Sequence, residues 1–452
     1  MTAQQLFVKT ALVCALASAA MATWAQAPVM DLKQVYQAAL EQDATIRASR
    51  ATADSGRERL PQARAGLLPQ ISASAGRNNN NLDTTAPNIL GTPVTTNEKY
   101  LSDNKTLQLR QPLVNMQRWL QFQQAKSVVE EVEANLDRDL QNLVVRVAGV
   151  YFEALMADEQ LDLVLAQKKT YTALVDAAKK GLAAGSGTRT DIDDAQSRLD
   201  MAAAQELEAR QNQDLARRQL QLLVNQPVNQ IAKLNVAALQ LSAPMPANLD
   251  DWTRKAEQAS PEIRAMQARL DAARREVSKA QAGHLPTVDA VAQWSNSGSE
   301  NITRVNSRFE NKTIGLQLNI PLYSGGYVNS TIRQAVAEQT RAEESLEALR
   351  RDLGVRVHKE YRGVSEGVLR VRALEQAARS AEQMMKSTQM SLTAGSRTQL
   401  DVLNAQQQFT LALRDLAQAR LVYLLSKVRL ASLVGDDAMV SVEQVNGSLR
   451  VR

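Results

Sequence analysis

The sequence predicts a mainly α-helical chain with a membrane β-barrel portion, internally duplicated so that it supplies four barrel strands plus long α-helices. Two proline-free stretches of over a hundred residues, short segments of strand-like alternation and motifs that recur along the chain all favour this fold class. Only 4% of the 452 residues are aromatic and the mean hydropathy is -0.31, so a large compact core is disfavoured and an elongated chain is favoured.

Residues 1–27 are expected to form a secretory signal peptide. One positive charge precedes the apolar run Thr10–Ala22, which is too short to span a bilayer as a stable helix. An A-x-A cleavage site then ends at Ala27. Because Pro28 directly after that bond would hinder cleavage, a cut after Ala25 is the alternative.

Long helices are expected where proline is absent. Leu113–Gln226 and Leu322–Arg452 contain none, and a proline inside a helix costs about 3 kcal/mol. Each stretch is broken once by a glycine-serine turn, AGSGTRTDIDDAQ at 184–196 and AGSRTQLDVLNAQ at 394–406, and these turns are identical at seven of thirteen positions. We predict long helices at about 114–184, 188–226, 323–393 and 398–435.

Motifs other than the turns also recur in the same order. ARAGLLP at 63–69 is echoed by AQAGHLP at 280–286, and LQLRQPL at 107–113 by LQLNIPL at 316–322. Such recurrence at a long period indicates a duplicated structural unit. The predicted divisions are a first structural repeat at 28–226, a linker between repeats at 227–249, a second structural repeat at 250–436 and a C-terminal tail at 437–452.

Apolar and polar residues alternate, as they do in a strand, ahead of Pro112 and Pro321, the prolines of the two LQL motifs. This alternation is clearest from Ile314 to Ile320. Roughly nine to eleven residues suit a tilted strand that crosses an outer membrane. The segments between the strands, Asn78–Asn81 and Ser295–Asn311, are polar and are expected to be loops. The four predicted strands lie at about 70–80, 104–112, 287–296 and 312–320.

Four strands cannot close a membrane barrel, whose smallest members have about eight. An open strand edge in lipid leaves backbone groups unsatisfied, so several chains must pool their strands. Oligomerisation is therefore expected if the strands span a membrane. The alternative is a small soluble sheet packed under the helices.

With these features, the sequence resembles the TolC family of outer-membrane efflux and secretion proteins. The resemblance rests on the signal peptide, the duplication, LxLxxPL before each long helix, and the G-S-x-T…D…AQ turn at each helical tip. It implies a homotrimer with a 12-stranded β-barrel in outer membrane lipid and an α-helical barrel in the periplasm of a Gram-negative bacterium. It also implies a periplasmic adaptor protein and an inner-membrane transporter of the ABC or RND type as partners, in type I secretion, multidrug efflux or both.

Adaptor tips dock against the helical hairpins in that family, so the resemblance implies a docking surface at the two turns. In this chain its residues are Leu182, Gly185, Ser186, Thr188, Leu392, Gly395, Ser396 and Thr398. Residue type adds local roles. The glycines are placed to adopt a positive φ, the serines to hydrogen-bond the local backbone, and the threonines to begin the return helices.

Residues just past the turns align with that family's periplasmic entrance constriction, where carboxylates ring the pore. They are Thr190, Asp191, Asp194, Arg397, Asp401 and Asn404. Three copies of Asp191 and Asp401 at a narrow mouth would repel one another, raise their pKa values and attract cations. The alternative is that an aspartate in a first helical turn only compensates the helix dipole. Two residues depart from the family pattern: Leu392 stands where some members have tyrosine, and Asn404 where an acidic residue occurs.

Catalysis, cofactors and metal binding are not expected. The two histidines, His284 and His358, lie at unrelated places, and no phosphate loop, metal-ligand spacing or nucleophile elbow is present. The only cysteine, Cys14, lies in the expected signal peptide. The 53 basic and 48 acidic residues are interleaved, so no nucleic-acid partner is expected.

The alternative functions are a periplasmic coiled-coil adaptor and a structural protein without a pore. The exported substrate, whether protein, drug or both, stays open.

Overall fold

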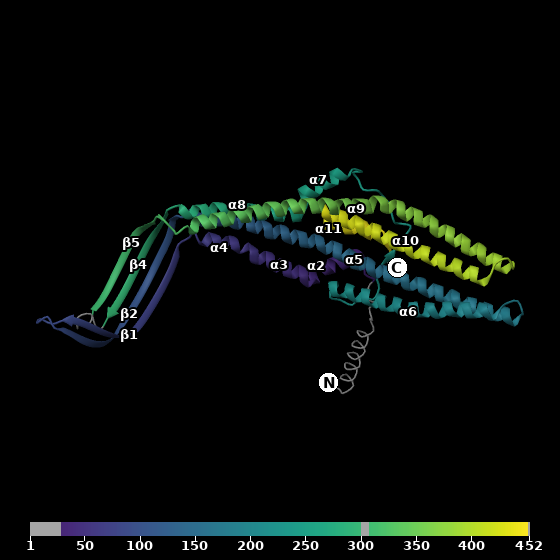
Figure 1. The fold of residues 1–452 in the computed structure, drawn as a ribbon, viewed down its shortest axis with the longest axis horizontal. Coiled ribbons are helices and arrows are strands. Elements are labelled where there is room, and N and C mark those ends of the chain that lie inside the picture. Colours follow the sequence, from purple (N-terminus) through teal and green to yellow (C-terminus); the bar gives the residue numbers. More distant parts are fainter. Residues whose placement is uncertain (1–28, 300–306, 451–452) are drawn as a thin grey trace, which may run out of the picture. The chain divides into compact units, whose positions relative to one another are not determined.

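A computed structural model describes residues 29–299 and 307–450, in which far more residues lie in helices than in strands (Figure 1). The expected signal peptide, 1–27, lies outside the described residues. The chain divides into two compact units, which we treat separately. The sheet unit comprises Arg50–Asp137 and Pro261–Arg351, and the tip unit comprises the chain up to Ser49, Arg138–Ser260 and the chain from Asp352 onward. Each unit takes segments from both halves of the sequence, so the compact units cut across the division predicted from motifs.

The sheet unit contains an antiparallel four-stranded sheet in the order β1-β2-β4-β5 (Figure 1). The strands are β1 (Gln70–Pro87), β2 (Pro93–Val114), β4 (Thr287–Ser299) and β5 (Ser307–Asn319). In the seam between the two sequence halves, Ser102 of β2 lies opposite Ser299 of β4, and the register shifts between Pro112 and Val114. Arg110 of β2 forms a 2.5 Å ion pair with the buried Asp289 of β4 across the same seam.

The strands are longer than the sequence pattern indicated, with 18, 22, 13 and 13 residues. The run Asn78–Asn81, expected in a loop, lies within β1 and pairs with Lys99–Ser102 of β2. The expectation was wrong because a polar side chain does not prevent its backbone from pairing, and alternation is visible only where one face is apolar. Of the expected loop Ser295–Asn311, the residues 295–299 and 307–311 lie in β4 and β5, and 300–306 lie outside the described residues.

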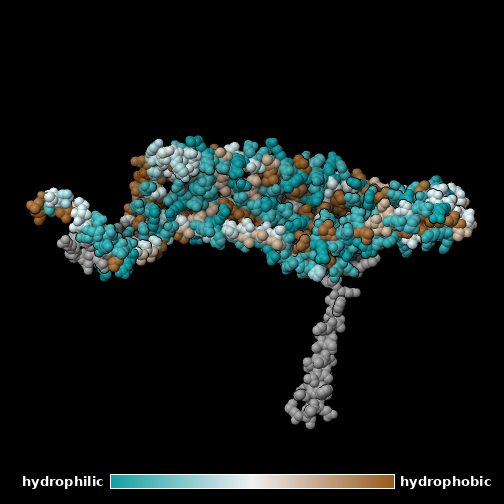
Figure 2. Space-filling model, turned by 60° about the horizontal axis from the view of Figure 1, so that its bottom comes forward, coloured by the Kyte–Doolittle hydropathy of each residue, from teal (hydrophilic) through white to brown (hydrophobic). Residues whose placement is uncertain are grey.

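The loop between β1 and β2 is a tight turn at Asn88–Thr92. The Asn88 side chain accepts hydrogen bonds from the backbone N–H groups of Leu90 and Thr92, each at 3.0 Å, and Gly91 adopts a φ of +76°. Ile89 and Leu90 at this turn are almost completely exposed, and Figure 2 shows the hydrophobic colour at the end of the hairpin.

Helices of the sheet unit are α4 (Arg59–Ala65), α8 (Pro261–Gln281), the short 3₁₀ helix η1 (Ala282–His284), most of α3 (Ala44–Arg57) and the first parts of α5 (Met116–Ala183) and α9 (Tyr327–Thr393). Polar contacts join them. Arg264 of α8 pairs with Asp137 of α5 at 2.9 Å, and Gln124 of α5 donates to Glu276 of α8 at 2.8 Å. Gly56 of α3 permits a close approach, because a Cβ there would lie 2.7 Å from Val132.

Four long helices run close to their predicted ranges. They are α5 (Met116–Ala183), α6 (Arg189–Val224), α9 (Tyr327–Thr393) and α10 (Gln399–Leu433). One 18-residue window of α5 is apolar enough, by length and composition, to cross a membrane, with a mean hydropathy of 1.2, but 44% of it is buried within the structure. That proportion is typical of a helix that packs one apolar face against other helices.

The remaining elements of the tip unit are small: α2 (Leu32–Gln42), β3 (Lys233–Leu234), α7 (Leu249–Ala259), α11 (Ala438–Asn446) and β6 (Leu449–Arg450). The tail expected at 437–452 therefore contains a helix and a strand, and β6 pairs with β3, which lies in the expected linker 227–249. Backbone hydrogen bonds also join Met30 to Gln230 and Ala232, so both ends of the described chain are attached to the linker.

Two fully buried tyrosines hold the linker on the helices. Tyr151 of α5 donates to the carbonyl of Ala232 at 3.0 Å, and burial raises its pKa, so the hydroxyl stays protonated. Tyr423 of α10 donates to the carbonyl of Ser242 at 3.0 Å and accepts from its N–H at 3.1 Å. Buried hydroxyls need such partners, so these contacts fix the linker's path.

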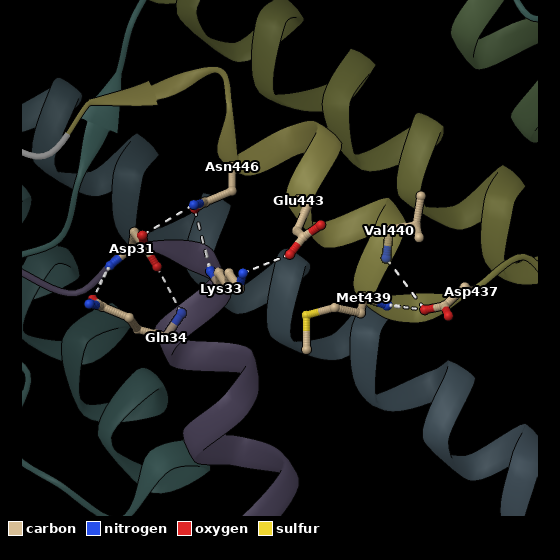
Figure 3. A network of polar contacts seen from close by, with 8 residues as sticks. All are labelled: Asp31, Lys33, Gln34, Asp437, Met439, Val440, Glu443 and Asn446. Atoms are coloured by element: carbon tan, nitrogen blue, oxygen red, sulfur yellow. Dashed lines mark hydrogen bonds and ion pairs between the residues drawn. The ribbon is translucent and has the colours of Figure 1, made fainter.

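Within the described residues, α2 near the beginning of the sequence contacts α11 near its end (Figure 3). Asp31 begins α2 with a capping box that it shares with Gln34, and its second carboxylate oxygen accepts from Asn446 of α11 at 3.1 Å. Lys33 pairs with Glu443 of α11 at 2.6 Å. The start of α2 is thus held by its own capping box and, in addition, by side chains more than 400 residues later.

Candidate functional site

The two turns that join the long helices have the same backbone geometry. In the first, Gly185 has a φ of +73°, its N–H donates to the carbonyl of Leu182 at 3.0 Å, and the Ser186 N–H donates to Gly181 at 2.9 Å. This pair of hydrogen bonds is a Schellman motif, which ends a helix at a left-handed residue. The Ser186 hydroxyl adds a bond to the Gly181 carbonyl at 3.3 Å.

In the second turn, Gly395 has a φ of +77° and its N–H donates to the carbonyl of Leu392 at 2.9 Å. The Ser396 N–H and hydroxyl both donate to the Ser391 carbonyl, at 2.9 and 3.2 Å. The positive φ predicted for both glycines and the local hydrogen bonds predicted for both serines are confirmed.

Each return helix begins with a capping box. Thr188 and Thr398 are the N-caps of α6 and α10, and each hydroxyl accepts from the N–H of the aspartate three residues later at 3.2 Å. The side chains of the two aspartates complete each capping box by accepting hydrogen bonds. Oδ2 of Asp191 accepts from the Thr188 N–H at 2.8 Å, and Oδ2 of Asp401 accepts from the Thr398 N–H at 3.0 Å. The aspartates predicted at the entrance thus have a structural role at the start of the helices.

The pKa of Asp401 is lowered, first by the hydrogen bond from the Thr398 N–H, then by the Thr398 hydroxyl, and less by Arg397, whose Nη1 lies 3.8 Å away. This direction, found in the single chain, is opposite to the rise expected for aspartates crowded in a ring. Because Oδ2 makes the cap bonds, only Oδ1 of Asp401 is directed to other groups.

Asn404, the departure from the acidic pattern, lies on the exposed side of α10 and accepts a hydrogen bond from Arg198 of α6 at 2.8 Å. The same guanidinium donates to Gln407 at 2.9 Å. Arg198 thus links the two hairpins, and the sequence analysis missed it. Its repeat counterpart is Gln408, so comparison of the two repeats gave no signal for this arginine.

The residues of the expected docking surface are not equally available. Leu182 is 40% exposed, but Leu392 is half-buried and packs against a cluster of buried residues in the tip unit. The cluster consists of Tyr171, Leu174, Ala202, Val402 and Leu403. The exposed residues at the turns are Leu182, Gly185, Ser186, Thr188, Gly395, Ser396 and Thr398, and beside them Thr190, Asp194 and Arg397 are also exposed.

A second candidate surface lies on β5 in the sheet unit. Ile314, Leu316 and Leu318 alternate along this strand and are 89%, 74% and 60% exposed. Within the described residues, β1 and β5 each pair on one side only. Tyr323 and Tyr327, just after the strand, are also exposed. Exposed apolar side chains that alternate along a strand, as here, are typical of a strand in contact with lipid.

Comparison with known proteins identifies the family. The family model described as outer membrane efflux protein matches residues 35–226 and 252–436. The chain belongs to this family. The chain is 33% identical to the alkaline protease secretion protein AprF of Pseudomonas aeruginosa, over 92% of this chain and 88% of the relative. It is 31% identical to the proteases secretion protein PrtF of Dickeya chrysanthemi, over 90% and 89%, and 29% identical to TolC of Escherichia coli, over 90% and 82%.

Solved structures agree on the fold. The chain matches CusC with a TM-score of 0.77 at 17% identity, over 90% of this chain and 92% of CusC. It matches VceC of Vibrio cholerae with a TM-score of 0.75 at 18% identity, over 90% and 96%. The protein is therefore an export channel of the Gram-negative outer membrane, and the alternatives of a periplasmic adaptor and a poreless coiled-coil protein are not supported.

Proposed function

We propose that this chain is the outer-membrane exit duct of a type I secretion system that exports protein. The observation that carries the proposal is the identity of 31% and 33% to two protease secretion proteins, each aligned over at least 90% of this chain. Multidrug efflux is the second candidate, favoured by the match to TolC and by the family's description. An inner-membrane transporter of the ABC type fits the first function, and one of the RND type fits the second.

The duct is a homotrimer that closes a 12-stranded barrel. One chain offers four strands with an unpaired edge on β1 and on β5, and a membrane barrel tolerates no open edge. The exposed alternating residues of β5 face outer membrane lipid, and Tyr323 and Tyr327 lie at its periplasmic boundary. The order of two strands, a long helix, a turn and a second helix occurs twice in the chain, which supports the internal duplication.

Three chains bring six turns to the periplasmic mouth, where they form a quasi-sixfold ring. The common geometry of the two turns supports this arrangement, since six nearly identical tips can meet six equivalent sites on adaptor proteins. The adaptor contacts the exposed residues of both turns, with Leu182 as its main apolar contact. Leu392 supports the second turn from within.

The entrance is narrowed by Asp191 and Asp401, whose Oδ1 atoms are directed into the pore while Oδ2 holds each helix start. Arg198 holds the two hairpins of one chain together through Asn404 and Gln407. Opening the mouth therefore requires that the hairpins separate against this contact.

Two experiments test the proposal. Purified protein in a planar bilayer should show small, cation-selective currents, and Asp401→Ala should reduce the selectivity. Protein that is soluble without detergent and conducts no current would contradict the channel.

To separate the substrates, a strain lacking this chain is tested for protease in the culture medium and for drug susceptibility. Loss of secretion with unchanged susceptibility supports type I secretion, and the reverse supports efflux.

A further inference from the structure

The tip unit contains a pocket of about 370 Å³ that none of the features above uses. It lies where the linker and α7 meet α9, α10 and α11, and its volume is within the range of small-molecule sites. Its walls are mostly apolar and include Met245, Trp252, Val364, Lys427, Leu430 and Val445.

Hydrogen bonds hold these walls in place. Tyr423 binds both backbone groups of Ser242 on the linker side. The Trp252 indole N–H donates to the carbonyl of Pro246 at 2.8 Å, which fixes the ring against the loop before α7. The pocket is therefore formed before any ligand enters, so little ordering energy is lost on binding.

The charges around the pocket do not balance. Asp436 also lines the pocket, and its carboxylate pairs at 2.7 Å with Lys255, whose ammonium lies 5.6 Å from the centre of the Trp252 ring, so these two charges cancel. Lys427 lines the pocket, is half-buried, and makes no hydrogen bond or ion pair to any residue in 29–299 or 307–450. A cation beside apolar walls is stabilised by an anion that brings its own apolar body.

We propose that this pocket binds a small hydrophobic anion, an aliphatic or aromatic carboxylate. Its apolar part packs between Trp252 and Val364, and its carboxylate pairs with Lys427. This site is separate from the helical turns and goes beyond the export function, so its test does not depend on conductance.

Fluorescence of Trp252 gives a direct test in the full-length protein embedded in lipid nanodiscs. The probe is 6-bromohexanoate, since bromine quenches a tryptophan that it contacts, and the uncharged control is 6-bromohexan-1-ol. We expect saturable quenching by the acid and at least tenfold weaker quenching by the alcohol. Trp252→Phe should remove the saturable component, which leaves the background from Trp119 and Trp294 of the sheet unit and, in the uncleaved chain, from Trp24.

Variants locate the anion. Lys427→Met keeps the aliphatic stem and should weaken binding of the acid at least tenfold, whereas Lys179→Met, at an exposed lysine of α5, should leave it unchanged. Ala431→Leu puts a larger side chain in the pocket wall, so it should also weaken binding of the acid. Equal quenching by acid and alcohol, or saturable quenching that survives in Trp252→Phe, would overturn the proposal.

Discussion

Single threonines determine where the return helices begin. Thr398→Ala removes the hydroxyl that accepts from the Asp401 N–H, and loss of an N-cap costs about 1 kcal/mol. We expect faster hydrogen exchange at the first turn of α10, with little change in the rest of the helix. Thr190→Ala serves as the control, because this exposed threonine lies in the first turn of α6 but is not its N-cap. If hydrogen exchange at the helix start were accelerated equally in both variants, the result would argue against a capping role for Thr398.

Asp401 makes the second turn sensitive to acid. Its pKa is lowered in the folded chain, so its contribution to the helix start is present above the ordinary aspartate pKa of about 3.9 and is lost as pH falls through the lower folded value. Protease cleavage at the turn should therefore rise only below about pH 4. Asp194→Asn should leave this profile unchanged, and Asp401→Asn should remove it. A transition centred above pH 5 would show that repulsion among the aspartates of the trimeric entrance outweighs the capping hydrogen bonds that lower the pKa of Asp401.

At the scale of elements, glycine allows α9 and α10 to approach closely. A Cβ on Gly363 would lie 2.5 Å from the Ser426 hydroxyl oxygen and 3.0 Å from its Cβ. Gly363→Ala should destabilise the protein by about 1–3 kcal/mol, as overpacking does, and should lower the midpoint of thermal unfolding in detergent. Adding Ser426→Ala should recover part of the loss. Gly354→Ala, where nothing lies within 4 Å, should be neutral or stabilising.

The contact between α6 and α10 through Arg198 is exposed, so it contributes little to overall stability, below about 1 kcal/mol. We expect this contact to affect how easily the entrance opens. Arg198→Ala should raise conductance without a measurable change in thermal unfolding, whereas Arg189→Ala, at the exposed start of the same helix, should change neither. An unaltered conductance in Arg198→Ala would show that the mouth is held closed elsewhere.

The helices and turns could be predicted more accurately than the strands, and the reason is physical. Proline-free composition and the Gly185 and Gly395 turns act locally, so each signal lies in a few adjacent residues. The strand ends depend on backbone pairing between β1 and β2, in which Asn78–Asn81 takes part despite its polar side chains. Arg198 could not be found because its partners lie more than 200 residues away.

At the scale of the whole molecule, the apolar face of β5 determines insertion into the membrane. An arginine that faces lipid near the bilayer midplane costs about 2–4 kcal/mol. Leu316→Arg should reduce the amount of protein recovered in the outer-membrane fraction. Gln317→Arg, on the opposite face of the same strand, should have little effect. Equal loss in both variants would show that the strand does not present Leu316 to lipid.

The compact units could not be derived from the repeated motifs, because each unit is assembled from both copies. Motif order shows which segments resemble one another, while burial depends on which segments meet. Tyr151 of the first copy and Tyr423 of the second both hold the linker, which the motif pattern marked only as a spacer.

The contact between α2 and α11 has a consequence for the order of biogenesis. Asp31 and Lys33 emerge from the ribosome and cross the inner membrane first, yet their partners Glu443 and Asn446 arrive last. A chain cut short before residue 443 by a nonsense codon or by stalled translation lacks these partners. Its α2 then keeps the packing against α6 and the backbone bonds of Met30 to the linker, and loses the contacts with α11. We expect such fragments to be cleaved by periplasmic proteases faster than complete chains are, because local opening of α2 is then easier.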